Sequence, residues 1–153
     1  EPDTTYARAV EYLEKRKYAQ ALEMLRPYDD VNTAIAYMSL GYDKAALRIF
    51  EKSPQRADNK YMQAILQARL GNEEKAVRLL LGAVDMNAQM KFRANLDPEL
   101  SELVKKYGLF KEEEDDWNWT GNNWMYDTVY WLNMILYDNI LGKTFFEHLE
   151  WDD

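Results

Sequence analysis

Small and large apolar residues recur in a fixed order between residues 9 and 83. In three windows a small residue is followed twelve positions later by another, and four positions after that by a large apolar residue. The windows are Ala9, Ala21 and Leu25; Ala34, Ala46 and Phe50; and Ala64, Ala76 and Leu80. Small residues let two helices approach closely, and the larger residue fills the space between them. Each window therefore predicts a pair of antiparallel helices.

Residues with special backbone preferences mark the ends of these helices. Gly41 and Gly71 are placed to end the first helix of the second and third windows in a left-handed conformation. Arg16 holds that position in the first window, so we expect its turn to be built differently. After the third window, Asp97 can cap a helix and Pro98 suits its first position. The apolar stripe that follows, through residue 107, predicts a helix that covers the last hairpin.

The small residues, glycines and large apolar residues of these windows resemble those of the tetratricopeptide repeat family over residues 3–88. The third window carries the family's small residues in order as Ala64, Gly71, Ala76 and Ala83. The chain departs from the family because it lacks the early Trp, lacks the closing Pro in the first and third windows, and spaces its repeats 25 and 30 residues apart. The resemblance implies an all-α, right-handed solenoid of about three degenerate helical hairpins with a capping helix, within residues 1–110. A more general helical-hairpin solenoid is the alternative.

The resemblance also implies a concave groove lined by the first helix of each hairpin. The family's groove positions fall on Tyr6, Val10, Leu13, Asn32, Ile35, Met38, Tyr61, Ile65 and Arg69. This set is mostly apolar, so we expect it to bind an apolar or aromatic segment of a protein partner. The family's basic clamp for a carboxylate is rejected, because only Asn32 and Arg69 could contribute to it. The alternative interpretation is that many of these side chains are core.

Charge and aromatic residues divide the chain near residue 111. Residues 112–153 hold 11 acidic residues and one basic residue, and all five Trp lie there. We expect an acidic linker over residues 111–123 and an aromatic helical segment over residues 124–153, packed on the array or on a partner. Its candidate interaction residues are Trp117, Trp119, Trp124 and Trp131.

Composition excludes several functions. The chain has no Cys and a single His, His148, which excludes disulfides and thiolate zinc sites and makes a His-rich metal site improbable. A net charge of -8 argues against nucleic acid as the partner. The most apolar run, residues 128–137, is too short to span a bilayer. We therefore expect no catalytic residue, no metal and no cofactor.

The sequence favours a non-enzymatic scaffold or adaptor that mediates protein–protein interaction. Two alternatives stay open, namely a carbohydrate-binding envelope protein that uses the Trp cluster, and a structural homodimer formed by exchange of the tail. Residues 25–28, 32–37 and 68–71 also resemble repeat proteins of the bacterial cell envelope, particularly of Bacteroides-type organisms. This resemblance favours a periplasmic or secreted location over a cytoplasmic one.

Overall fold

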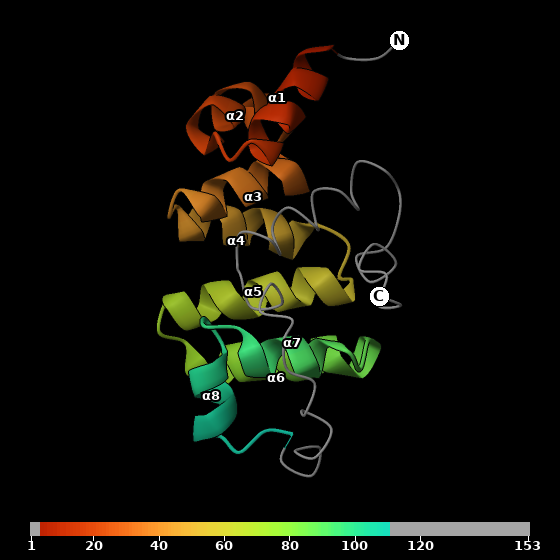
Figure 1. Cartoon of the computed structure of the whole chain (residues 1–153), viewed down its shortest axis with the longest axis vertical. Coiled ribbons are helices and arrows are strands. Elements are labelled where there is room, and N and C mark those ends of the chain that lie inside the picture. The colour runs from red at the N-terminus through yellow and green to blue at the C-terminus, as the bar shows by residue number, and fades with distance from the viewer. Residues whose placement is uncertain (1–3, 111–153) are drawn as a thin grey trace. The chain divides into compact units, whose positions relative to one another are not determined.

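The computed structural model describes residues 4–110, and every regular element in that range is a helix (Figure 1). This confirms the all-α class. The contacts divide these residues into two compact units, residues 4–54 and residues 55–110.

The first unit contains two helix pairs joined by a short 3-10 turn. Its elements are α1 (Thr4–Glu14), α2 (Tyr18–Leu25), η1 (Arg26–Tyr28), α3 (Val31–Ser39) and α4 (Asp43–Lys52). Helix α1 packs on α2, α2 on α3, and α3 on α4. Each helix contributes apolar side chains to the core, among them Leu13, Leu25, Ile35 and Phe50.

The second unit contains one long helix pair and two short helices. Its elements are α5 (Ala57–Arg69), α6 (Glu73–Met86), α7 (Met90–Leu96) and α8 (Ser101–Lys106). Helices α5 and α6 run side by side, and α7 contacts both α6 and α8 (Figure 1). Met62, Leu66, Leu80 and Val104 are among its core residues.

The residues that define the three sequence windows are all buried. The six small residues are completely inaccessible, and the three large ones are exposed by at most 1%. They are Ala9, Ala21, Ala34, Ala46, Ala64 and Ala76, with Leu25, Phe50 and Leu80. The prediction that these residues lie in the core is confirmed.

The three turns inside the helix pairs share one hydrogen-bond pattern. In each, a backbone N–H bonds to the carbonyl five residues earlier, at 2.8 Å from Lys17, 2.9 Å from Tyr42 and 2.9 Å from Asn72. Gly41 and Gly71 are left-handed, as predicted, with φ of 88° and 85°. The expectation of a different first turn is wrong, because Arg16 is also left-handed, with φ of 63°. The backbone hydrogen bonds that close this turn outweigh the steric cost of the Arg16 Cβ in a left-handed conformation.

The C-terminal part of the second unit also differs from the prediction. Helix α8 begins at Ser101, and residues 98–100 form a turn, so Pro98 does not open the helix. The Asp97 carboxylate accepts the Glu99 N–H at 2.9 Å and thereby caps the turn. Helix α7 was not expected. Its buried side includes Arg93, whose side chain is completely inaccessible. A charged residue at a core position interrupts the apolar pattern from which the helix could have been predicted.

The proposed linker over residues 111–123 and the aromatic segment over residues 124–153 lie outside the described residues. The predictions made for them, including those for the four candidate Trp, stay predictions.

Candidate functional site

Most of the predicted groove residues are buried. Val10 is 8% exposed, and Leu13, Ile35, Met38, Tyr61 and Ile65 are exposed by at most 1%. Their side chains contribute to packing and offer no open surface in this conformation. Tyr6 is half-buried, and Arg69 keeps about a quarter of its side chain accessible. Binding of a partner by these positions stays a prediction.

Tyr6, on α1, contacts the beginning of α3. Its hydroxyl donates a 2.7 Å hydrogen bond to Asp30 Oδ2 and accepts one of 2.7 Å from Asn32 Nδ2. Asp30 is the N-cap of α3, where its Oδ1 accepts the Thr33 N–H at 3.1 Å and its own N–H donates to Thr33 Oγ1 at 3.3 Å. This reciprocal capping box fixes the first turn of α3 and so positions both Asp30 and Asn32 against Tyr6.

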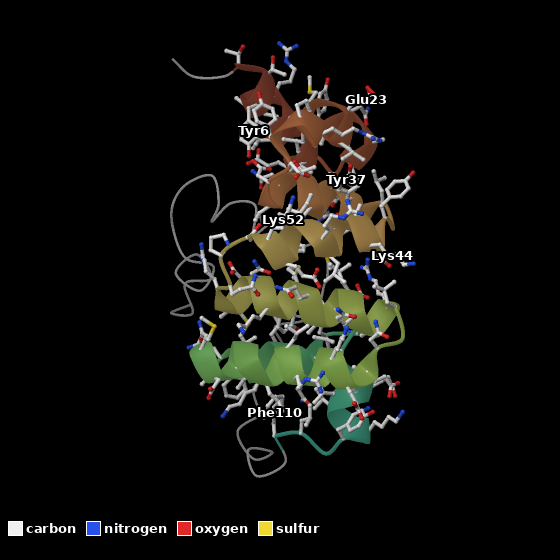
Figure 2. The ribbon with its side chains drawn as sticks, turned by 180° about the vertical axis from the view of Figure 1, so that it is seen from behind. Tyr6, Glu23, Tyr37, Lys44, Lys52 and Phe110 are labelled. Atoms are coloured by element: carbon white, nitrogen blue, oxygen red, sulfur yellow. The ribbon has the colours of Figure 1, made fainter. Side chains whose placement is uncertain are left out.

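Tyr28, at the end of η1, completes this group. Its ring meets that of Tyr6 edge to face, with centroids 4.7 Å apart, and it is 39% exposed. Tyr6, Tyr28, Asp30 and Asn32 form what we call the tyrosine–aspartate cluster. Figure 2 shows Tyr6 and Tyr37 at different sides of the first unit, so the cluster is separate from the pair that Tyr37 forms with the exposed Tyr42.

Two electrostatic features characterise the tyrosine–aspartate cluster. Burial, followed by the hydrogen bond to Asp30, raises the pKa of Tyr6 well above its ordinary value, so its phenol stays neutral. Asn32 is only 4% exposed, and its Oδ1 has no hydrogen-bond donor among residues 4–110. A buried acceptor without a donor is uncommon in proteins.

In the second unit, two predicted groove residues bind a turn of the same chain. The Tyr61 hydroxyl donates a 2.7 Å hydrogen bond to Asp97 Oδ2. Arg69 donates to both carboxylate oxygens of Glu99, at 2.9 Å from Nε and 2.6 Å from Nη2. The turn at residues 97–99 therefore occupies the side of α5 on which a partner was expected.

Asp97 is an unusual carboxyl because it is completely buried. Burial raises its pKa to about 6, although the Glu99 N–H, the Tyr61 hydroxyl and the positive charge of Arg93 all act to lower it. Burial, followed by the neighbouring Asp97, also raises the pKa of Tyr61 well above its ordinary value.

No family model matches the chain, and comparisons with curated proteins and with solved structures gave no match either. Among residues 4–110, no group of three or more His, Cys, Asp or Glu side chains is arranged to hold a metal ion. Within the same range, no helix combines the length and apolar character needed to cross a membrane.

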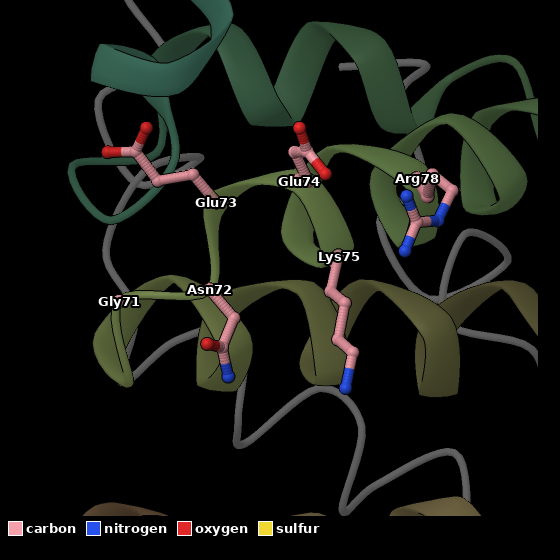
Figure 3. Close-up of a pocket in the computed structure, with 6 residues that line it drawn as sticks. All are labelled: Gly71, Asn72, Glu73, Glu74, Lys75 and Arg78. Atoms are coloured by element: carbon pink, nitrogen blue, oxygen red, sulfur yellow. The ribbon is translucent and has the colours of Figure 1, made fainter.

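A recess lies at the turn between α5 and α6. It has a volume of about 410 Å³ and is lined by Gly71, Asn72, Glu73, Glu74, Lys75 and Arg78. Figure 3 shows Asn72 and Lys75 pointing to one side of the turn and the two glutamates to the other. Glu73 already accepts hydrogen bonds from Lys106 at 2.7 Å and Tyr107 at 2.9 Å. The charges are mixed and do not converge on one point, so the recess indicates no particular ligand.

Sequence reasoning named Tyr6 and Asn32 but missed Tyr28 and Asp30. The Asp-x-x-Thr spacing of Asp30 and Thr33 is a capping signal that could have located the start of α3. No sequence signal indicates that Tyr6 lies against this cap.

Proposed function

We propose that this chain is a non-enzymatic helical-hairpin module, of the tetratricopeptide type, that binds a protein partner through the tyrosine–aspartate cluster. The repeated turn and the buried small residues support the hairpin-repeat part of the proposal. The absence of Cys and the single His in the sequence support a role in binding rather than catalysis.

The accessible tyrosine of the cluster is the observation that carries the binding role. Tyr28 is 39% exposed beside the hydrogen-bonded Tyr6. Tyrosines of this kind, apolar over the ring and polar at the tip, are over-represented among residues that dominate binding energy. In the second unit, Tyr61 is completely buried and Arg69 is paired with Glu99, so we place partner binding on the first unit.

The proposal can be tested with a photo-crosslinking amino acid in the full chain at position 28, and with a control at position 42. Tyr42 is a suitable control because it is 57% exposed in the same unit and also belongs to an edge-to-face tyrosine pair. We expect one protein to crosslink at position 28 and not at position 42. Crosslinking only to a second copy of the chain would favour the homodimer alternative.

The crosslinked protein must then bind as a purified component. We expect Tyr28→Ala to raise its Kd by about tenfold and Tyr42→Ala to leave it unchanged, measured by calorimetry. Equal affinity for both variants would exclude the cluster as the binding surface.

A further inference from the structure

Asp30 carries a negative charge that no cation of the described chain neutralises. Its carboxylate accepts hydrogen bonds from the neutral Tyr6 hydroxyl and Thr33 N–H. Within residues 4–110, no Lys, Arg or His nitrogen lies within 4.0 Å of it. The neighbouring Asp29, by contrast, pairs with Lys52 at 3.0 Å. The N-terminus of α3 supplies only about half a positive charge, which leaves the position net negative.

The two tyrosine rings of the cluster add to this negative potential. The faces of aromatic rings are electron-rich and attract ammonium and guanidinium groups that lie within about 6 Å. The Tyr6 and Tyr28 rings stand nearly perpendicular, at 67°, so each presents a face in a different direction. Because Tyr28 is partly exposed, a group from outside can reach its ring.

Asn32 supplies an acceptor whose hydrogen-bonding capacity is unused. Its Nδ2 donates to Tyr6, while its Oδ1 has no donor among the described residues. An occupant that reaches this oxygen, after a rotation of the half-buried Tyr6, would satisfy it. Carboxylates bring only acceptors at neutral pH, whereas ammonium and guanidinium groups bring only donors.

We propose that the tyrosine–aspartate cluster binds a cationic side chain, arginine or lysine, presented by the protein partner. In naming a residue of the partner, this inference deepens the proposed function and rests on it. Asp30 would supply the charge and Tyr28 the aromatic face. Asn32 would supply an additional acceptor once the Tyr6 side chain has turned aside.

The test uses the full chain, labelled with ¹⁵N, and four small probes followed by NMR. Two probes are cationic, N-acetyl-arginine amide and N-acetyl-lysine amide, and two are neutral analogues, N-acetyl-citrulline amide and N-acetyl-norleucine amide. We expect saturable shifts with millimolar Kd for both cations, centred on the Asn32 side-chain amide and the Tyr28 backbone amide. The neutral analogues should bind about tenfold more weakly or not at all.

Three variants assign the contributions. Asp30→Asn removes the charge but keeps both a good N-cap and an acceptor for Tyr6, and it should weaken binding of the cations about tenfold. Tyr28→Ala should weaken it about two- to fivefold. Tyr42→Ala, the matched exposed tyrosine, should leave it unchanged.

Two results would overturn the inference, namely equal binding of citrulline amide and arginine amide, or equal binding by Asp30→Asn and the unmodified chain. Failure here is distinguishable from failure of the proposed function. If a partner crosslinks at position 28 but the chain does not bind the cationic probes, the proposed function is retained and the cation site is rejected. If the chain binds the cationic probes specifically but no partner crosslinks, the cation site is retained and the protein-binding function is rejected.

Discussion

Replacing Asp97 by Asn should change how the stability of this protein depends on pH. The carboxyl has a pKa of about 6 when folded and about 3.8 when solvated, so the native state binds its proton more tightly than the unfolded state does. The stability that this group contributes is therefore complete below pH 3.8 and is lost as the pH rises through 6. By linkage, a pKa difference of this size corresponds to about 3 kcal/mol.

The measurement is denaturant unfolding of the unmodified chain and Asp97→Asn at several pH values between 4 and 7. Groups other than Asp97 titrate in both proteins and largely cancel in the difference between their free energies of unfolding. We expect the unmodified chain to lose about 2–2.5 kcal/mol relative to the variant between pH 4 and pH 7, most of the full difference. Small domains are stable by only about 5–15 kcal/mol, so a change of this size is readily measured.

The difference should be a smooth function of pH with its midpoint between the two pKa values. A difference that does not vary with pH would show that Asp97 is solvated in the native protein. A difference of opposite sign would show that its hydrogen bonds to Tyr61 and Glu99 outweigh its burial.

Three substitutions test the backbone conformation by thermal or denaturant unfolding, and two of them should stabilise the protein while the third should destabilise it. Arg16→Gly should stabilise the protein by about 1 kcal/mol, because the left-handed φ of 63° strains a residue with a Cβ; no gain would mean that this turn is not left-handed. Gly71→Ala should destabilise it by about 1 kcal/mol, because a φ of 85° strains a residue with a Cβ. No neighbouring atom lies within 4 Å of the added Cβ, so backbone strain is the whole of the expected cost. Gly82→Ala, inside α6, should stabilise by about 0.5–1 kcal/mol, because the new Cβ would meet only the Lys60 side chain, at 3.5 Å; a loss would indicate a tighter helix contact.

Local features of the fold were predictable because they depend on residues close together in sequence. The small residues of the three windows and the left-handed Gly41 and Gly71 fall into this class. Arg16 was misread because its identity disfavours the left-handed conformation, while the positions around it favour the same turn. The hydrogen-bond pattern decided the outcome, and residue type alone does not report it.

The site was harder to predict because its contacts join distant segments. Tyr6 meets Asp30 across 24 residues, and Tyr61 meets Asp97 across 36. Periodicity places Tyr61 and Arg69 on one helix, but it does not reveal that the turn at residues 97–99 folds back onto them. The sequence therefore predicted that Tyr61 and Arg69 line an open groove, although Tyr61 is buried and Arg69 is paired with Glu99.

The contacts that hold the last part of the second unit have a consequence for limited proteolysis. Ala88 and Gln89, between α6 and α7, are exposed and belong to neither helix. A protease that cuts there would sever the backbone but leave the bonds from Asp97 to α5, from Glu99 to α5 and from Lys106 to the start of α6. The fragment would then stay attached as a non-covalent complex, and the two pieces, once separated, should be able to reassemble.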